Sequence, residues 1–524
     1  MVGCATLPTD YERKASQAIE STGDTRLGKW FEPRVAAHGG NRSGIYPLRY
    51  GMDALAARIG LANAADRSID AQYYIWSGDL TGRLMLAALM RAADRGVRVR
   101  LLLDDLPAGG HDRALKAFDL HPRVEVRLFN PFAERRFRGL EMVRQFSRLN
   151  RRMHNKAFVA DNQAAIVGGR NIGNEYFEAK PEIDYRDFDV LTVGPVVRDV
   201  SDSFDAYWNS PFAVPVAALT AEEPLTGADL RELRGRLAAH VRKVGRSEYA
   251  AAMRGSDFVQ QARRHELPLL WAEAYAVYDE PEKFVTAPEE RSGQLGPQLR
   301  KLVEELDREL FIVSPYFVPE ESGVELFAEL EERGVEVRIL TNSLASTDSP
   351  AFAGYANYRV PLLQAGVDLY ELKPSGRYPE ERHKGSPLGS SGSSGGSLHA
   401  KVFIFDRETT FVGSMNLDPR SLRLNSELGV VIESAAFARK LVNLVQEGLP
   451  TEAYRLGLHY EPPRVVPPLL RRRGVREEGG GPRLVWTTVD EQGERQRFDT
   501  DPEATWWRRF MMGVFSIFAP EGQL

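Results

Sequence analysis

Apolar, strand-like runs alternate with helical stretches along the chain, and this alternation occurs twice. Residues 67–76 and 95–102 are rich in β-branched, aromatic and other apolar side chains and predict two strands with a helix between them. The same order returns at residues 308–317 and 333–340, and in both copies a glycine stands where the helix must end. Strand–helix–strand order with apolar strands predicts an α/β fold in which helices cover the sheet.

The repeat divides the chain into parts. Corresponding points of the two copies are separated by about 240 residues throughout, which predicts two homologous lobes at residues 46–215 and 296–450. Residues 216–295 contain the Ala, Arg, Leu and Glu periodicity of a helical insertion. Residues 1–45 form a lead segment, and residues 451–524 form a tail that ends in a predicted helix. We therefore expect a two-lobed α/β body with a tail.

Composition narrows the functional classes. The 524 residues carry a net charge of −5, whereas a protein that mainly grips nucleic acid has a basic excess, so nucleic acid is not an expected partner. The single cysteine, Cys4, excludes an intramolecular disulfide and a cysteine-based metal cage. The nine histidines never stand at H-x-H or H-E-x-x-H spacing, so we predict no zinc site.

Each copy of the repeat supplies one histidine segment with the same internal spacing. A histidine is followed two positions later by lysine and seven positions later by aspartate, and a G-x-x-N turn begins after six further residues. The positions are His154, Lys156, Asp161, Gly168, Gly169 and Asn171 in the first copy, and His399, Lys401, Asp406, Gly413, Ser414 and Asn416 in the second. One such match could arise from ordinary core histidines, but two in equivalent parts of a repeat indicate shared chemistry.

Strand geometry assigns roles within each segment. Alternate side chains of a strand share a face, so each histidine points the same way as the lysine two positions later. Asp161 and Asp406 lie an odd number of positions from their histidines and face the other way, which predicts structural roles for both. The turns then bring Asn171 and Asn416 back beside the histidines as amide donors.

Two His-Lys-Asn sets facing each other across a pseudo-twofold axis fit phosphodiester exchange. One imidazole attacks phosphorus and forms a phosphohistidine, while the other protonates the leaving alkoxide and later deprotonates the incoming alcohol or water. The lysines and asparagines hold the phosphoryl oxygens in the transition state. With two cations already present, the scheme requires no metal ion and no cofactor.

Each histidine also needs a carboxylate on its second ring nitrogen. Glu427 follows the second motif, and Asp187 occupies the comparable place after the first. We predict that these two residues orient the histidines; the alternative is a pair of solvent-exposed carboxylates at the starts of strands.

The double motif resembles the signature of the phospholipase D superfamily. With the segments 70–76, 101–105, 148–154 and 418–421, the chain resembles the bacterial cardiolipin synthases of the C type over nearly its whole length. This resemblance implies two similar α/β/α lobes with pseudo-twofold symmetry and one shared active site. It also implies that His154 is the nucleophile. The residues themselves do not show which of the two histidines has this role.

One departure is visible within the repeat. Gly169 stands where the second copy has Ser414, so a hydroxyl group is missing from the first half-site. We therefore expect the two half-sites to be inequivalent.

The resemblance implies transfer of a phosphatidyl group onto phosphatidylglycerol, which gives cardiolipin. The donor is phosphatidylglycerol or phosphatidylethanolamine, and both alternatives stay open. A phospholipase D hydrolase that releases phosphatidic acid differs only in the second nucleophile. A nuclease of the same superfamily and a non-catalytic lipid-binding scaffold are further alternatives, disfavoured by the acidic balance and by the two intact motifs respectively.

Two segments favour a membrane surface as a partner. Residues 131–153 mix seven arginines with aromatic and aliphatic side chains, a pattern that suits anionic headgroups but also an ordinary amphipathic helix on its own lobe. Residues 506–518 are apolar on most sides but too short to cross a bilayer, and they either lie in the interface or dock on the protein. Together they predict a peripheral enzyme of the bacterial inner membrane.

The N-terminus offers one further anchor. Val2-Gly3-Cys4 resembles the end of a bacterial lipoprotein signal, although the charged and apolar stretches that precede such a cysteine are absent. Either the match is accidental, or a signal sequence is missing upstream and Cys4 is lipidated.

Overall fold

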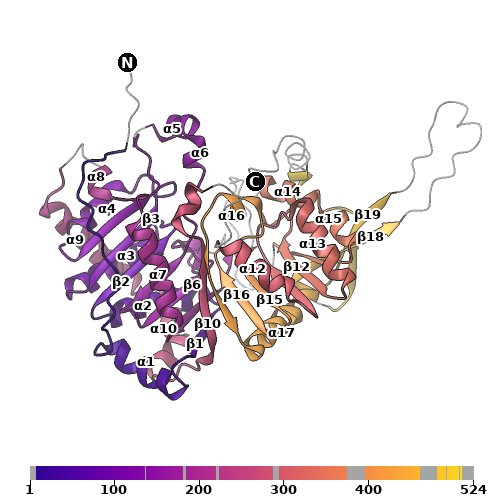
Figure 1. Ribbon diagram of the computed structural model, residues 1–524, viewed down its shortest axis with the longest axis horizontal. Coiled ribbons are helices and arrows are strands. Elements are labelled where there is room, and N and C mark those ends of the chain that lie inside the picture. Colours follow the sequence, from indigo (N-terminus) through magenta and orange to yellow (C-terminus); the bar gives the residue numbers. More distant parts are fainter. Residues whose placement is uncertain are drawn as a thin grey trace, which may run out of the picture.

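The computed structural model describes residues 7–135, 137–180, 185–219, 224–286, 294–347, 349–374, 396–460, 481–490, 492–506 and 508–509. These residues form two α/β lobes that lie side by side and share one continuous sheet (Figure 1). Cys4 and most of the predicted terminal helix lie outside the described residues.

The first lobe is built on a sheet whose central strands run parallel. Strands β2, β3 and β4 pair in parallel, and the remaining strands extend the sheet antiparallel on both sides. Across the sheet the order is β9 (Ala213–Pro215), β4 (Val124–Phe129), β3 (Arg98–Asp104), β2 (Ser68–Tyr73), β5 (Ala157–Ala160), β6 (Ala164–Gly168), β8 (Asp189–Val193) and β1 (Ser43–Leu48). The predicted strands at 67–76 and 95–102 are β2 and β3.

The second lobe repeats this order strand for strand. The counterparts, again across the sheet, are β18 (Ala453–Tyr460), β13 (Asp368–Leu372), β12 (Glu336–Asn342), β11 (Glu309–Val313), β15 (Val402–Phe405), β16 (Thr409–Gly413), β17 (Leu428–Glu433) and β10 (Leu270–Tyr278). Strands β19 (Pro482–Val489) and β20 (Arg495–Phe498) continue the sheet beyond β18. The predicted strands at 308–317 and 333–340 are β11 and β12.

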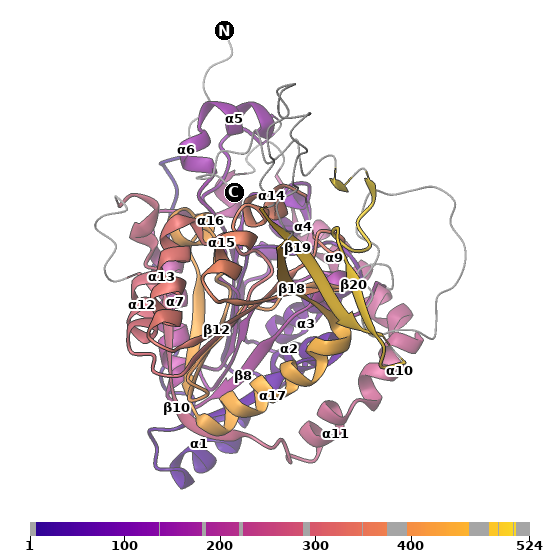
Figure 2. The same cartoon turned by 90° about the vertical axis from the view of Figure 1, so that its right-hand side faces the viewer.

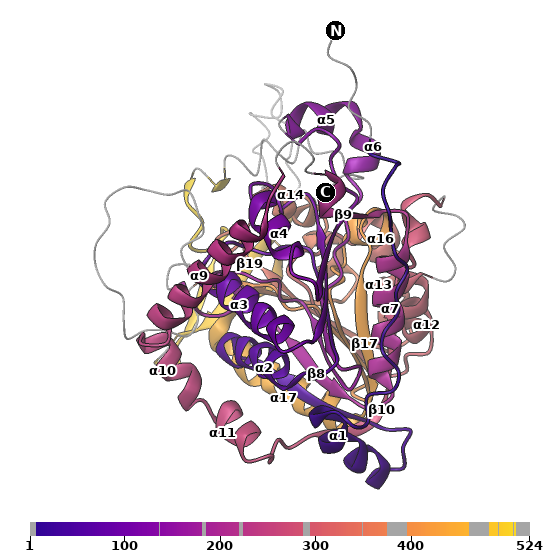
Figure 3. The ribbon, with the colours of Figure 1, turned by 90° about the vertical axis from the view of Figure 1, so that its left-hand side faces the viewer.

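Helices cover both faces of each half of the sheet (Figures 2 and 3). In the first lobe α2 (Gly51–Ala64), α3 (Leu80–Asp94) and α4 (Asp112–Asp119) cover one face, and α7 (Val196–Asn209) covers the other. In the second lobe α12 (Leu295–Glu304), α13 (Glu320–Glu332), α14 (Ser349–Ala356) and α15 (Arg359–Gln364) cover one face, and α17 (Ala435–Glu452) covers the other. Helix α1 (Arg26–Ala37) precedes β1.

Strand β10 joins the lobes. Its residues Leu270–Ala272 pair with β1 of the first lobe, and Glu273–Tyr278 pair with β17 of the second. The segment between the lobes contains the helices α8 (Val216–Leu219), α9 (Gly227–Val244), α10 (Glu248–Gly255) and α11 (Asp257–Arg263), and then this strand, which the sequence did not predict. Four of the nine residues of β10 are Trp, Tyr or Val, which favour strands, and the strand was missed because it was grouped with the helical stretch before it.

A single apolar core lies between the lobes. It combines Val159 and Val190 of the first lobe with Phe311, Ile404 and Val430 of the second, all at most 1% exposed. Because protein interiors are close-packed, this core fixes the position of one lobe against the other.

Asp161 closes the hairpin between β5 and β6 and also anchors the start of β2. Asp161 and Asn162 adopt positive φ angles of 52° and 51°, which the tight hairpin turn requires. The Asp161 carboxylate accepts hydrogen bonds from the backbone N–H groups of Asp66, Arg67 and Ser68 at 2.7–2.9 Å.

Asp406 does the same in the second lobe. Its carboxylate accepts the backbone N–H groups of Asp307, Arg308 and Glu309 at 2.8–3.0 Å, and its φ is also 52°. Both motif aspartates therefore hold the chain where it enters the sheet, away from the histidines.

Replacing Asp161 by alanine is expected to lower the free energy of unfolding by about 3 kcal/mol, because three N–H groups lose a charged acceptor. Asp161→Asn, which tolerates the positive φ and keeps one acceptor oxygen, is expected to cost less. Denaturant unfolding of both variants measures the difference. Equal stability of Asp161→Ala and the natural chain would contradict this role.

Candidate active site

His154 is held by backbone contacts with the opposite lobe. It follows the short helix α6 (Phe146–Leu149), and its N–H donates to the carbonyl of Ser426 at 2.9 Å. Its Nδ1 atom lies 2.9 Å from Oε2 of Glu427. Because an ionised carboxylate only accepts, Nδ1 carries the proton and Nε2 keeps its lone pair for a substrate.

His399 repeats this arrangement with the lobes exchanged. Strand β14 (Ser397–Leu398) pairs in parallel with β7 (Tyr185–Arg186), and the His399 N–H donates to the Arg186 carbonyl at 2.8 Å. Its Nδ1 atom lies 2.5 Å from Oδ2 of Asp187. Each of the two nominated carboxylates thus contacts a histidine, and each belongs to the lobe opposite to that histidine.

The motif lysines lie buried beside their histidines. Lys156 donates from Nζ to the carbonyl of His154 at 2.6 Å, and Lys401 donates to that of His399 at 2.5 Å. The side chains of both lysines are at most 1% exposed. The Lys156 ammonium also lies 5.6 Å from the centre of the Tyr74 ring, a cation–π distance.

The two orienting carboxylates explain why one half-site has Gly169 where the other has Ser414. A Cβ atom on Gly169 would stand 2.2 Å from Oδ1 of Asp187, so no side chain fits there. In the other half, the Ser414 hydroxyl donates to Oε2 of Glu427 at 2.5 Å and accepts the Leu428 N–H at 3.0 Å. The extra hydroxyl therefore supports the longer carboxylate.

The preceding glycines allow close strand approach. A Cβ on Gly168 would meet Asp189 and Phe188 within 2.5 Å, and one on Gly413 would meet the Leu428 carbonyl at 2.5 Å. Both glycines pair with the strand that begins just after the carboxylate, β8 or β17, and their lack of a side chain allows this close approach.

The two motif asparagines differ. The Asn171 side chain accepts the Ile75 N–H at 3.0 Å and donates from Nδ2 to the Tyr176 hydroxyl at 3.1 Å, so it is engaged within the protein. Oδ1 of Asn416 is buried and has no hydrogen-bond partner among the described residues. The two asparagines therefore differ in their contacts within the described structure, and their predicted role as amide donors stays a prediction.

Three tyrosines that the sequence analysis did not single out pack against the imidazoles. Tyr74 lies edge-on to His154 at 5.2 Å, Tyr176 lies edge-on to His399 at 5.1 Å, and Tyr185 stacks on His399 at 5.2 Å. The run of aromatic residues that contains Tyr74 indicated only a strand.

Two further residues that the sequence analysis did not assign to the site hold the chain just before each histidine. Asp104, the last residue of β3, accepts the Met153 N–H at 2.9 Å and binds the buried Arg152 guanidinium. Asn342, the last residue of β12, accepts the Leu398 N–H at 2.9 Å and donates to its carbonyl at 3.0 Å. The sequence carried a signal for both residues, because β3 and β12, which are equivalent strands of the repeat, each end in a polar residue.

Glu427 is further held by a buried ion pair. The Glu427 N–H donates to Oδ2 of Asp279 at 2.9 Å, and the Asp279 N–H donates back to the Glu427 carbonyl at 3.0 Å. Lys283 donates to the same carboxylate at 2.8 Å, and the Tyr207 hydroxyl donates to the Asp279 carbonyl at 2.6 Å. Residues from both lobes therefore fix the position of Glu427.

Burial controls the charge state of the site. It lowers the pKa of His154 to about 4 and that of His399 to about 3, although the facing carboxylates oppose the shift. It also lowers the pKa of Lys401 to about 8. Burial alone would raise the pKa values of Glu427 and Asp187, but the adjoining histidines and lysines lower them below their ordinary values.

These shifts describe neutral imidazoles beside ionised carboxylates. Burial also lowers the pKa of Lys156 well below its ordinary value, although the charge of Glu427 opposes the shift. Lys401 lowers the pKa of His154, and Lys156 lowers that of His399, so each histidine senses the lysine of the other lobe. The two half-sites thus share one electrostatic environment.

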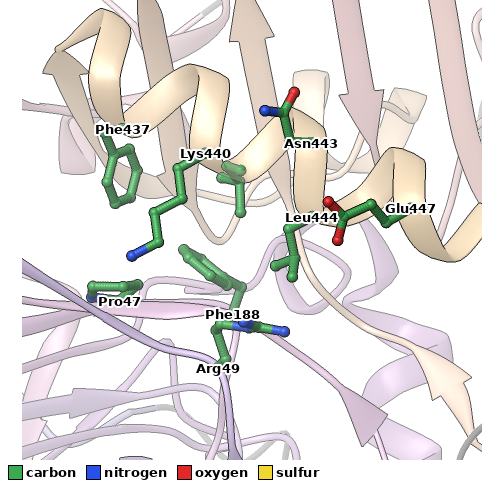
Figure 4. Close-up of a pocket in the computed structure, with 9 residues that line it drawn as sticks. Pro47, Arg49, Phe188, Phe437, Lys440, Asn443, Leu444 and Glu447 are labelled. Atoms are coloured by element: carbon green, nitrogen blue, oxygen red, sulfur yellow. The ribbon is translucent and has the colours of Figure 1, made fainter.

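A cavity of about 260 Å³ opens between the lobes near this site (Figure 4). Phe188 of the first lobe and Phe437 and Leu441 of α17 form part of its wall. Phe188 follows Asp187, but the motif histidines and lysines do not line the cavity. The reacting groups therefore lie outside it. Among the described residues, no group of three or more His, Cys, Asp and Glu side chains is arranged to hold a metal ion.

Several known proteins resemble this chain in sequence. A family model described as "Cardiolipin synthase, PLD-like domain" matches residues 59–208 and 299–447, one region in each lobe. Cardiolipin synthase C of Escherichia coli is 39% identical over 498 residues, which cover 95% of this chain and 99% of that protein. The major cardiolipin synthase of Bacillus subtilis is 25% identical over 403 residues, or 76% of this chain and 67% of that protein.

A solved structure supports the fold. The phosphatidylserine synthase of Haemophilus influenzae superposes with a TM-score of 0.53 at 16% sequence identity, over 81% of this chain and 91% of that one. The predicted two-lobed phospholipase D-like fold is confirmed. With a family model matched in both lobes and a relative 39% identical over nearly its full length, the chain belongs to the cardiolipin synthase family of phospholipase D-like enzymes.

Proposed function

We propose that the protein makes cardiolipin by transferring a phosphatidyl group from a phospholipid donor to phosphatidylglycerol through a phosphohistidine intermediate. One observation carries the mechanism: each motif histidine is oriented by a carboxylate of the opposite lobe, so that two imidazoles belong to one site. The relatives named cardiolipin synthases support the choice of reaction. The donor is phosphatidylglycerol or phosphatidylethanolamine.

In the first half-reaction, Nε2 of His154 attacks the donor phosphorus. An N–P bond forms, and the bond from phosphorus to the oxygen of the donor headgroup breaks. His399 supplies the proton that this oxygen takes as it leaves. Burial disfavours a protonated His399 in the free enzyme, but the negative charge of the arriving phosphodiester favours it.

In the second half-reaction, His399 takes the proton from a glycerol hydroxyl of phosphatidylglycerol. The freed oxygen attacks phosphorus, the N–P bond breaks, and His154 is regenerated. Glu427 stabilises the positive charge on the His154 ring while the adduct exists, because its carboxylate accepts from Nδ1.

Lys156 and Lys401 place two amines in a buried site, and the negative charge of the arriving phosphodiester favours their ammonium form, which stabilises the phosphoryl oxygens. Since the site acts on lipids, we propose peripheral attachment to the bacterial inner membrane. Within the described residues, no helix combines the length and apolar character needed to span a bilayer.

The reaction is tested with purified full-length protein and vesicles that contain labelled phosphatidylglycerol. Cardiolipin is the expected product, and His154→Gln and His399→Gln are each expected to abolish it. Acid quenching should trap labelled phosphatidyl groups on the protein, and loss of this adduct in His154→Gln identifies the nucleophile. Phosphatidic acid as the sole product would contradict the synthase assignment.

Asn342 is expected to act as a positioning residue for His399. Asn342→Ala removes both hydrogen bonds to Leu398, and the resulting shift of His399 should lower kcat by about 100-fold while KM changes little. Ser343→Ala is the matched control, because Ser343 lies in the same buried turn and bonds Ser346 instead. Unchanged kcat in Asn342→Ala, with the control intact, would show that His399 needs no such support.

Activity is expected to fall above about pH 8, because Lys401 has a pKa of about 8 and loses its charge as pH rises through that value. His154, with a pKa of about 4, stays a neutral nucleophile throughout the range above it. A plot of kcat/KM against pH for a water-soluble short-chain donor reports these free-enzyme groups. A profile that keeps rising well beyond pH 8 would contradict a role for the Lys401 cation.

A further inference from the structure

The segment before His154 exposes an unusual number of apolar side chains. Phe137, Leu140, Val143 and Phe146 are 65%, 49%, 78% and 42% exposed, and all four lie within ten residues. They belong to helix α5 (Arg138–Arg144) and to the residues that flank it. We call these four side chains the α5–α6 surface. Large exposed apolar residues occur singly elsewhere in the described chain, whereas here four recur at every third position.

The arginines of the same segment point into the protein. Arg135 binds the carboxylates of Asp105 and Asp112, and Arg138 donates to the Asp105 carbonyl at 2.9 Å. These contacts neutralise the basic charge that the sequence suggested for headgroup binding.

The remaining basic residues of the segment follow the same pattern. Arg148 binds Glu141 at 3.0 Å, Arg151 donates to the Lys283 carbonyl at 2.9 Å, and Arg152 binds Asp104. Only Arg144 is exposed among the described arginines of this segment. What the segment presents outward is therefore apolar rather than cationic.

The α5–α6 surface lies at the end of the molecule where strands β3 and β4 end. Asn130, directly after β4, donates to the carbonyls of Arg148 and Arg151, so this segment lies over the carboxyl ends of β3 and β4. Figures 2 and 3 show α5 and α6 standing out from the body at this end. The segment then leads directly into His154.

The second lobe exposes an aromatic residue at its equivalent edge. Trp506 is 74% exposed, and Arg508, two positions on, donates to the carbonyl of Leu344 at 3.1 Å. Leu344 follows the carboxyl end of β12, whose last residue holds the chain before His399. The two lobes thus expose apolar groups on the same side as their histidines.

We propose that the α5–α6 surface inserts into the apolar boundary of a lipid bilayer and holds the active site against the membrane. This inference rests on the proposed function, because a phosphatidyl substrate resides in a bilayer. Helical side chains of Phe, Leu and Val that stand beside a lipid-processing site fit the interface between headgroups and acyl chains. Since five of the described arginines of this segment bond within the protein and only Arg144 is exposed, the attachment is mainly apolar and tolerates salt.

Insertion is tested with an environment-sensitive fluorophore on the Val143→Cys variant in a Cys4→Ser background, which removes the only natural cysteine. Vesicles of phosphatidylglycerol and phosphatidylcholine should shift its emission to the blue, and about 0.5 M NaCl should leave the shift in place. The matched control is the same label on Leu120→Cys. Leu120 is also exposed but stands before the start of β4, at the opposite end of that strand, and its label should not respond.

The triple variant Phe137→Ser, Leu140→Ser, Val143→Ser is expected to bind vesicles at least about tenfold more weakly, because three apolar contacts are lost. It should retain activity on a water-soluble short-chain phosphatidylglycerol, which shows that the site is intact. Leu120→Ser should bind vesicles as the natural chain does.

An unresponsive Val143 label, or vesicle binding abolished by salt, would overturn the proposal. So would a triple variant that binds vesicles normally but changes its oligomeric state, because the surface would then contact a second copy. Failure of the natural chain to make cardiolipin would instead count against the proposed function, since vesicle binding is measured without catalysis.

Discussion

The exchange of carboxylates between the lobes is the constraint on which the rest of the structure depends. Glu427 lies 273 positions from His154 in the chain, and Asp187 lies 212 positions from His399, yet each pair is in contact. Neither lobe can orient its own histidine alone. The shared core, the bridging strand β10 and the buried Asp279–Lys283 pair all serve to keep the two lobes in the register that these contacts need.

This constraint also explains the asymmetry of the repeat. Asp187 leaves no room for a side chain at position 169, whereas the longer Glu427 takes a hydrogen bond from Ser414. The loop before the histidine is also held differently in the two lobes, by the Asp104–Arg152 pair in the first and by Asn342 in the second. The two halves have thus diverged at the residues that support the histidines, while the histidines and lysines have stayed the same, a pattern that suits two imidazoles with different tasks.

Much of this could be predicted from the sequence because it depends on local periodicity and on the repeat. The four strands and the histidine–lysine pairs follow from local periodicity and from the repeat. Structural roles for Asp161 and Asp406 were predicted from alternation along a strand, whereas the structure places both residues in the turns that follow β5 and β15. The exchange of Glu427 and Asp187 could not be predicted, because it depends on how the two lobes meet. Strand β10 was missed because it was grouped with the helical stretch before it, although four of its nine residues are Trp, Tyr or Val, which favour strands. Composition also left open whether the arginines before His154 face headgroups or the protein, because it does not show that Asp104, Asp105 and Glu141 lie within their reach.

The central claim is tested most directly by ¹⁵N NMR of the histidine side chains, with His154 assigned by its loss in His154→Gln. If Glu427 accepts the proton of Nδ1, Glu427→Gln should shift the His154 Nδ1 resonance, and Asp187→Asn should shift that of His399 while leaving His154 nearly unchanged. A His154 resonance that responds to Asp187→Asn and not to Glu427→Gln would show that each lobe orients its own histidine, and the shared-site account would be wrong.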